Sequence, residues 1–402
     1  MQFSELAFEF TGDANPLYTL REQLSAQGKA VVDLISANPG EHGMLFPQDI
    51  LREAMSRACD AAAVYKPDSL GQRVAREAVA DYYRSRISES AEKSHEINAG
   101  DIVLTPGTSL SYFYCFKLLA EPGDEILCPQ PSYPLLDYIA QLCSVQLSKY
   151  ELDETKNWAI DFENLTAQIN SRSRAIVLIS PHNPTGMLAS SAEIATLAEI
   201  ASKHNLPIIA DEVFAEFLFD DDELPRPMHS SAPLVFTLNG LSKSLALPGI
   251  KFGWMLVTGD KKLVRRFISA LEMISDTFLP VNEITQFAVP EIFERGQEFQ
   301  KQYRDWIKQC REIALGALDG TGLVSPRGGF YITIPVNGNE DDFAVSLLEK
   351  EQILVHPGHF YDVSGNHIVC TFVCEHKKLA ETFKRIANLA LSKAGEPPAL
   401  RP

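Results

Sequence analysis

Short runs of apolar residues recur through the middle of the chain, and longer stretches with helical spacing of apolar and polar residues separate them. The apolar runs predict strands at 101–105, 125–129, 174–180, 206–211 and 234–239. Amphipathic stretches such as 109–125 and 191–205 predict the helices between these strands. Strands that alternate with helices of this length indicate an α/β fold whose mostly parallel sheet is covered on both faces.

The last third of the chain has a different pattern. Two long helical stretches, at 263–276 and roughly 287–316, precede three apolar runs and a final helix, which together indicate a smaller α+β domain. The first 45 residues are punctuated by Pro and Gly and show no core of their own. We therefore expect a large domain at 46–285, and a small domain with an N-terminal arm made of 1–45 and 286–402.

Charge and composition restrict the possible partners. The 402 residues carry a net charge of -17, which argues against nucleic-acid binding and against adsorption to an anionic membrane. No apolar stretch reaches the ~18 residues that a membrane helix needs, and the acidic start does not resemble a signal peptide. The seven scattered cysteines form no CxxC pair. We expect reduced thiols in a cytoplasmic protein, and no metal site.

Ligands of open α/β sheets bind beyond the carboxyl ends of the strands, so the residues that follow each predicted strand are the candidates for chemistry. After 101–105 come Gly107, Thr108 and Ser109, where a helix begins. Free N–H groups and hydroxyls at a helix start can hold a phosphate. An ordinary strand-to-helix turn with a Ser or Thr cap is the alternative.

Three further strand ends carry polar residues. Asn183 stands between two prolines and could present its amide to a bound ring, although a structural turn would use the same residues. Asp211 ends a buried strand and needs a partner, such as a protonated pyridine nitrogen or a nearby base. Lys243, among small and apolar neighbours, is a candidate Schiff-base amine, with a surface lysine as the alternative.

The order of these segments resembles the class I/II aminotransferase family, which has the fold-type I architecture of pyridoxal-phosphate (PLP) enzymes. The resemblance covers roughly residues 30–390. It rests on TPGTS, EPGDEILCPQPSYP, SPHNPTG, ADEV, GLSK, PGIKFGW and PRGGFY, in that order. It implies a large domain with a mostly parallel seven-stranded sheet and a smaller α+β domain.

The resemblance also implies roles for individual residues. Lys243 would hold pyridoxal 5'-phosphate as a Schiff base and move protons, Asp211 would pair with the pyridine nitrogen, and Tyr133 would stack on the ring. Tyr65 would reach the cofactor of a neighbouring subunit, so a homodimer with shared sites is implied. The other implied cofactor contacts are Asn183 and Phe214 beside the ring oxygen, and Gly107, Thr108, Ser109, Ser242 and Lys251 around the phosphate.

Three positions depart from the family pattern. Lys251 stands where the family usually has Arg, and Phe214 stands where most members have Tyr. Val369 falls where members carry the Arg that clamps the substrate α-carboxylate. Asn38 and Asn183 are the substrate contacts that we expect, and other candidates for the missing clamp are His42, Lys66, Arg73 and Arg327.

The leading functional interpretation is an aminotransferase acting on an amino acid and a 2-oxo acid. The missing Arg raises an alternative on the same fold, namely a PLP-dependent lyase, decarboxylase or C–C bond-forming enzyme. A PLP-fold sensor domain of a transcription regulator is a third interpretation. It is disfavoured, because the first 45 residues show no helix-turn-helix signal and the net charge is negative.

Overall fold

The computed structural model describes residues 6, 15–86, 96–219 and 224–391, and a large twisted sheet lies at its centre. Six of the strands run in one direction, β9 lies antiparallel between β2 and β8, and β5 lies antiparallel to β4. The spatial order is β2 (Ile102–Thr105), β9 (Gly253–Gly259), β8 (Leu234–Gly240), β7 (Ile208–Asp211), β6 (Ser173–Ile179), β3 (Glu125–Gln130), β4 (Gln146–Asp153) and β5 (Ala159–Ile160).

The prediction of a mostly parallel seven-stranded sheet is confirmed, with one addition. The two-residue strand β5 extends the sheet to eight strands at one edge. Alternate residues of β6 belong to different apolar clusters. Val177 and Ile179 pack with α5 (Thr108–Leu119), α6 (Leu135–Cys143) and α10 (Lys261–Phe278), whereas Ile176 and Leu178 pack with α7 (Phe162–Gln168) and α8 (Ser191–His204). Helices therefore cover both faces, which explains why the central strands read as continuous apolar runs.

The helices around this sheet begin and end at residues suited to those positions. Ser190 and Glu193 form a capping box at the start of α8, and Asp260 accepts two backbone N–H bonds at the start of α10. The helices of this part of the structure are α3 (Gln48–Ala61), α4 (Arg73–Arg84), α5 (Thr108–Leu119), α6 (Leu135–Cys143), α7 (Phe162–Gln168), α8 (Ser191–His204), α9 (Leu241–Ser244), α10 (Lys261–Phe278) and α11 (Glu283–Arg295).

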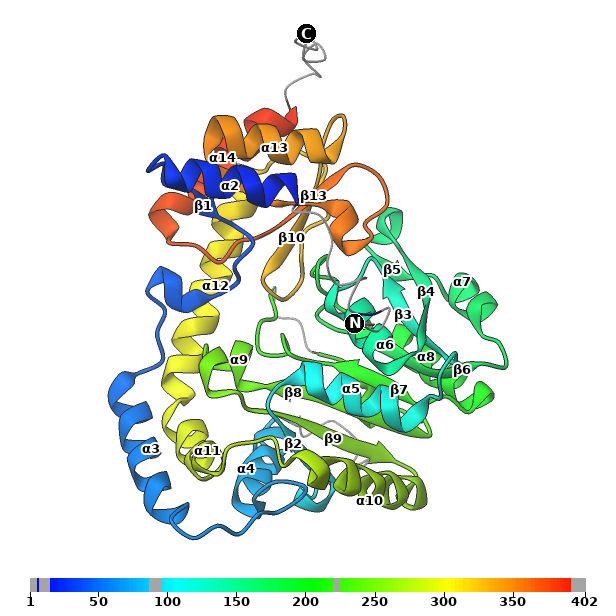
Figure 1. The fold of residues 1–402 in the computed structure, drawn as a ribbon. Coiled ribbons are helices and arrows are strands. Elements are labelled where there is room, and N and C mark those ends of the chain that lie inside the picture. Colours follow the sequence, from blue (N-terminus) through cyan, green and yellow to red (C-terminus); the bar gives the residue numbers. More distant parts are fainter. Residues whose placement is uncertain (1–5, 7–14, 87–95, 220–223, 392–402) are drawn as a thin grey trace, which may run out of the picture.

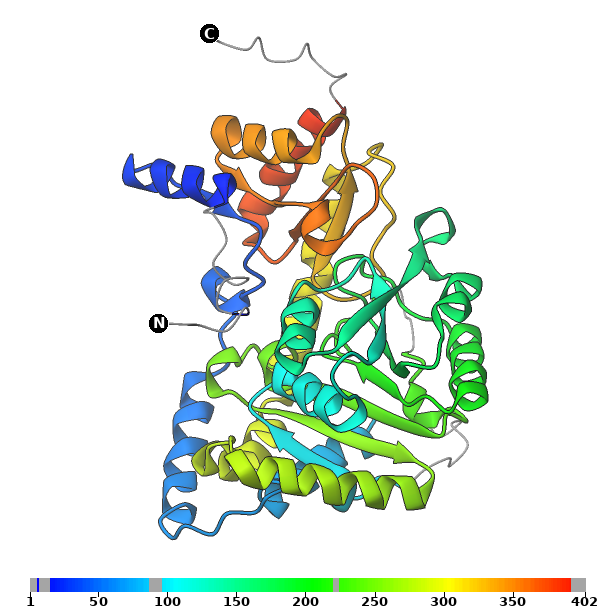
Figure 2. The same cartoon turned by 45° about the vertical axis from the view of Figure 1, so that its right-hand side comes forward.

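A second group of elements gathers at one end of the molecule, as Figure 1 and Figure 2 both show. The long helix α12 (Gln297–Ala317) runs toward this end and stacks Trp306 against His376 of α14 (His376–Leu391). Two small sheets lie here, together with the helices α2 (Pro16–Ala26) and α13 (Glu340–Glu351). The first pairs β10 (Tyr331–Pro335), β13 (His367–Thr371) and β12 (His356–Pro357), and the second pairs β1 (Val32–Asp33) with β11 (Ile353–Leu354).

The N-terminal segment belongs spatially to this second group. β1 runs parallel to β11, and the Leu34 carbonyl accepts a hydrogen bond from the Thr371 backbone N–H. Helix α11 spans residues on both sides of 285/286 and packs against α3 and α4, so the chain stays helical through that point. The domain limits at 45/46 and 285/286 remain predictions.

Backbone and side-chain bonds fasten the small three-stranded sheet onto the large one. Thr333 of β10 donates its hydroxyl to the Pro184 carbonyl at 3.2 Å. The Arg327 and Gly328 N–H groups both donate to the Gly186 carbonyl. The Ser132 N–H, in the loop after β3, donates to the Tyr361 carbonyl at 2.8 Å. These bonds place β10, β12 and β13 over the carboxyl ends of β3 and β6.

Candidate active site

Lys243 lies in the short helix α9, three residues after the buried strand β8 ends. Its Nζ atom is 6.0 Å from the centre of the Phe214 ring and 5.8 Å from that of Phe330. The Ala37 carbonyl accepts from the same atom at 3.4 Å, so the N-terminal segment also reaches this lysine. Removal from water lowers the pKa of Lys243 to about 8, because the charged amine loses hydration among apolar rings.

Asp211 ends the neighbouring strand β7, so its side chain lies at the same edge of the sheet as α9. It is buried, and burial raises its pKa to about 6. Two hydrogen bonds to the carboxylate oppose this rise: the Val213 N–H donates to Oδ1 at 3.0 Å, and the Tyr112 hydroxyl donates to Oδ2 at 2.9 Å. The Asp211 carboxylate can therefore accept a further hydrogen bond from a positively charged donor.

Tyr112 was not predicted from the sequence. It lies on α5, one helical turn after Thr108 at the helix start. That spacing places both residues on the same face of the helix, and it is the signal that could have identified Tyr112.

Asn183 lies in the turn that follows β6, and its side chain is buried. Its Oδ1 atom has no hydrogen-bond partner within the described part of the chain. A buried amide without a partner is costly, which favours a ligand that completes it. The bond from Thr333 to the adjacent Pro184 carbonyl fixes this turn beneath β10.

Three backbone segments expected around a phosphate meet at one point. Gly253, at the start of β9, pairs with Thr105 of β2 on one side and with Gly240 of β8 on the other. A Cβ atom at Gly253 would lie 2.9 Å from the Gly107 Cα atom, so the two backbones approach closely. Gly107 itself has a φ of 146°, which strongly favours glycine.

The structure brings the remaining predicted phosphate contacts to the same edge. Thr108 and Ser109 begin α5, whose N–H groups are free at this end. Ser242 precedes the catalytic lysine candidate, and Lys251 is exposed just before β9. The described residues make no ion pair with Lys251 within 4.0 Å, which leaves its charge available to an anion.

Two aromatic residues, Tyr133 and Phe214, lie near Asp211 and Lys243. Tyr133 lies in the loop after β3 and is 40 % exposed. Burial of its hydroxyl, and secondarily the charge of Asp211, raises the pKa of Tyr133, so this phenol lies within electrostatic reach of the carboxylate. The Phe214 ring packs at 4.9 Å from Phe330 and 6.1 Å from Tyr331 and provides no hydroxyl.

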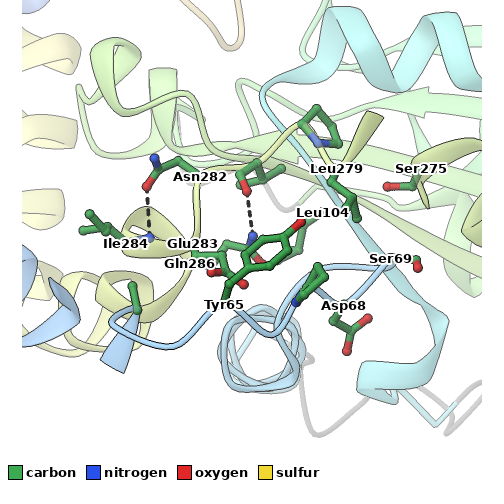
Figure 3. Close-up of a pocket in the computed structure, with 15 residues that line it drawn as sticks. Tyr65, Asp68, Ser69, Leu104, Ser275, Leu279, Asn282, Glu283, Ile284 and Gln286 are labelled. Atoms are coloured by element: carbon green, nitrogen blue, oxygen red, sulfur yellow. Dashed lines mark hydrogen bonds between the residues drawn. The ribbon is translucent and has the colours of Figure 1, made fainter. Parts of the chain in front are cut away.

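Tyr65 lies away from this group in its own chain. It borders a cavity of about 350 Å³ between the loop after α3 and the α10–α11 connection, and neither Lys243 nor Asp211 lines that cavity. Figure 3 shows Tyr65 in this cavity beside Glu283 and Gln286. Its side chain is 70 % exposed, so it is available to a second copy of the chain.

The residues considered in place of the missing arginine are dispersed. Asn38 uses its side chain locally, accepting from the Gly40 N–H and donating to Glu41. Arg73 is 80 % exposed and pairs with Glu77. Burial lowers the pKa of His42, and Lys66 and Arg327 are exposed. None of these five residues contacts Lys243 or Asp211 through a hydrogen bond or ion pair in the described structure.

The described residues contain no group of three or more His, Cys, Asp or Glu side chains arranged to hold a metal ion. Among the same residues, no helix has both the length and the apolar character needed to cross a membrane.

Comparison with known proteins gives consistent matches across nearly the whole chain. Residues 31–386 match the family model described as aminotransferase class I and II. The glutamate-pyruvate aminotransferase AlaA of Escherichia coli K12 is 30% identical over 365 residues, covering 85% of this chain and 86% of the relative. The alanine aminotransferase of Mycobacterium tuberculosis H37Rv is 28% identical, covering 97% and 92%.

A solved structure supports the same conclusion. An aminotransferase from Escherichia coli superposes with a TM-score of 0.85 at 27% identity, covering 96% of this chain and 98% of that chain. These relatives are aminotransferases, so the comparisons do not favour the alternative of a lyase, decarboxylase or C–C bond-forming enzyme.

Proposed function

Because this chain belongs to the class I and II aminotransferase family, whose members are PLP-dependent, it is a PLP-dependent aminotransferase, and we propose that Lys243 holds the cofactor as a Schiff base. The observation that carries the proposal is the placement of the Lys243 amine just after the end of β8, near the Phe214 and Phe330 rings and in a buried position that favours its uncharged form. An uncharged amine is the nucleophile that attacks a carbonyl carbon.

The residues of the site fit PLP. The buried Asn183 amide has an oxygen without a partner among the described residues, which favours a ligand that completes it. Asp211 offers a carboxylate to a protonated ring nitrogen. The α5 start and Lys251 offer N–H groups and a positive charge to a phosphate.

When bound, the cofactor withdraws electrons from the substrate carbon that carries the amino group. The chain supplies the remaining functions. Lys243 accepts the proton from that carbon at its Nζ atom and donates the proton again at the end of the proton transfer. Asp211 holds the ring nitrogen protonated, and Tyr133 covers one face of the ring.

For substrates we propose L-alanine as amino donor and 2-oxoglutarate as acceptor. The support comes from the activities for which two relatives are named, a glutamate-pyruvate and an alanine aminotransferase. At 30% and 28% identity these relatives suggest the pair to test first.

The test is a single half-reaction. Purified holoenzyme mixed with L-alanine alone should lose its Schiff-base absorbance, gain the pyridoxamine absorbance and release one pyruvate per site. Added 2-oxoglutarate should then restore the original spectrum. Lys243→Ala should lower the rate by a factor of about 10² to 10⁴, because it removes the proton carrier. Pyruvate released in excess together with ammonia, with the spectrum unchanged, would contradict the proposed reaction.

We also propose a cytoplasmic homodimer. The structure supports reduced surroundings, since all seven cysteines are unpaired and six of them are buried. Four large apolar side chains are exposed on the two segments that border the cavity of Tyr65. They are Val64 and Tyr65 after α3, and Met273 and Phe278 on α10. A patch of this kind is typical of a surface that another subunit covers.

A further inference from the structure

The face of the small sheet that is turned toward the site carries Val369 where the family pattern has arginine. Val369 of β13 pairs directly with Thr333 of β10 on one side and with His356 of β12 on the other. Directly paired residues point to the same face of a sheet. Because Thr333 donates to the Pro184 carbonyl, that face is the one turned toward the Asn183 turn.

His356 is one of the polar groups on this face, and two phenols contact its ring. Tyr18 Oη lies 2.7 Å from His356 Nε2, and Tyr361 Oη lies 3.2 Å from His356 Nδ1. Burial lowers the pKa of His356 to about 4, so its ring is neutral near pH 7 and carries a single N–H.

In the Nδ1–H tautomer, Tyr18 donates to Nε2 and the Nδ1–H donates to Tyr361. The contact lengths of 2.7 Å at Nε2 and 3.2 Å at Nδ1 are compatible with this tautomer. Tyr361 then accepts at its oxygen, and its own O–H stays free to donate elsewhere.

Tyr361 is joined to the loop that carries Tyr133, because the Tyr361 backbone carbonyl accepts from the Ser132 N–H. Burial raises the pKa of Tyr361, and the phenols of Tyr331 and Tyr133 raise it further, which places all three hydroxyls within electrostatic reach of one another. Tyr331 in turn contacts the Phe214 ring beside the catalytic lysine.

We propose that Tyr361 is a specificity-determining residue whose hydroxyl donates a hydrogen bond to the substrate carboxylate, in the place where an arginine is missing. His356 and Tyr18 are positioning residues, since they act by directing the Tyr361 hydrogen toward the substrate. This inference rests on the proposed function, because it assumes that a carboxylate-bearing substrate binds against Lys243. Recognition of the carboxylate by a neutral donor distinguishes this enzyme from members that use a guanidinium.

The experiment uses holoenzyme and propionate, which is L-alanine without the amino group and binds without reacting. The dissociation constant of propionate is measured by calorimetry for wild type, Tyr361→Phe, Tyr18→Phe and the control Tyr303→Phe. Tyr303 is a buried residue of α12, and its hydroxyl has no hydrogen-bond partner among the described residues. The control thus removes the same atom outside the network.

Tyr361→Phe should weaken propionate binding about tenfold, because a donor to a charged acceptor is lost. Tyr18→Phe should weaken it about threefold, although Tyr18 does not touch the substrate. Without the Tyr18 donor, the imidazole hydrogen can move to Nε2. The Tyr361 hydroxyl then donates to Nδ1 and is no longer free to donate to the substrate carboxylate. Tyr303→Phe should bind propionate like wild type.

The half-reaction gives a second readout. Tyr361→Phe should raise the KM for L-alanine about tenfold with little change in kcat, and it should leave the slow reaction with ethylamine, which has no carboxylate, unchanged. Wild-type affinity for propionate in Tyr361→Phe would overturn the role of Tyr361, and wild-type affinity in Tyr18→Phe would overturn the positioning role. If wild type binds propionate but does not convert L-alanine, the proposed donor fails while this inference stands.

Discussion

Asp211 shows how a single side chain is prepared for a positive partner. Burial raises its pKa to about 6, and the Tyr112 hydroxyl together with the Val213 N–H restrains the rise by bonding the charged form. Near neutral pH the carboxylate is therefore mostly ionised before the cofactor arrives. A protonated ring nitrogen can bind to it without first displacing a proton.

Replacing Tyr112 by Phe should make cofactor binding more sensitive to acid. Loss of this donor raises the pKa of Asp211 further, so at low pH the carboxyl must lose a proton before it can bind the ring. We expect PLP to bind about tenfold more weakly at pH 6, and less than about threefold more weakly at pH 8.5. Fluorescence titration of the cofactor-free variant measures both constants.

Tyr303→Phe is again the matched control, since it removes a buried hydroxyl that bonds no other described residue. Equal weakening of Tyr112→Phe at both pH values would mean that Tyr112 only fills space beside the carboxylate.

Much of the site could be predicted at this scale, because its residues stand in local motifs. Asp211 and Lys243 follow strands that are visible as apolar runs, and the structure places both at the same edge of the sheet. Tyr112, His356 and Tyr361 were not predicted. Their partners are 99, 338 and 5 residues away along the chain, and the first two contacts exist only after the elements have packed.

At the scale of elements, β2, β8 and β9 meet at the place where we propose that the phosphate binds. Gly253 pairs with strands on both sides, and its backbone lies against Gly107 at the start of α5. Interior packing of this density leaves no room for a methyl group. The short distance between these backbones therefore fixes the position of the α5 N-terminus.

Gly253→Ala tests this arrangement. The added Cβ would lie 2.9 Å from the Gly107 Cα atom, so the strands must separate or the loop must shift. We expect the free energy of unfolding to fall by about 1–3 kcal/mol, and the PLP affinity to fall as well, because the N–H groups of α5 move. Urea unfolding and cofactor titration measure the two effects.

Gly249→Ala provides the control four residues earlier, in the short 3-10 helix before β9, because a Cβ there meets no atom within 4 Å. It should leave both stability and affinity close to wild type. Equal effects of the two substitutions would show that loop flexibility, rather than close packing of the backbones, governs the site.

Some strands of the large sheet could be predicted from the sequence and others could not, because only buried strands of sufficient length produce a visible apolar run. The five strands predicted from the sequence, β2, β3, β6, β7 and β8, are buried almost throughout, so each shows a continuous apolar run. The two-residue strand β5 is too short to show any period, and its pairing with β4 depends on packing. Helix α11 crosses the predicted domain boundary at 285/286. The periodicity of a helix does not show where the chain passes from one domain to the other.

At the scale of the whole molecule, Tyr65 connects the site to oligomeric state. It is 70 % exposed, and it lies apart from Lys243 in its own chain. If Tyr65 serves the cofactor, it does so in another subunit. The proposed homodimer therefore has active sites that neither subunit completes alone.

Subunit mixing tests this directly. Lys243→Ala and Tyr65→Phe, each impaired alone, should recover activity when they are unfolded together and refolded as a mixture. Hybrid dimers contain one site with both native residues, so about a quarter of all sites should be intact. Activity per site and size-exclusion mass are the measurements.

Lys243→Ala mixed with Asp211→Ala is the control, because both changes affect the site of their own chain and no hybrid site is intact. Recovery in this control, or none in the Tyr65 mixture despite dimer formation, would count against shared sites.

The attachment of the small sheet to the turn around Asn183 has a consequence for how the protein folds. The bonds from Thr333 to Pro184 and from Arg327 to Gly186 join segments that are more than 140 residues apart. Contacts between such distant segments form late, because closing a long loop opposes them. The small sheet is thus attached after the strands of the large sheet, and the segment that carries Lys243, have formed. Cofactor capture should consequently mark the end of folding, so that a chain with an unfinished small domain stays without its prosthetic group.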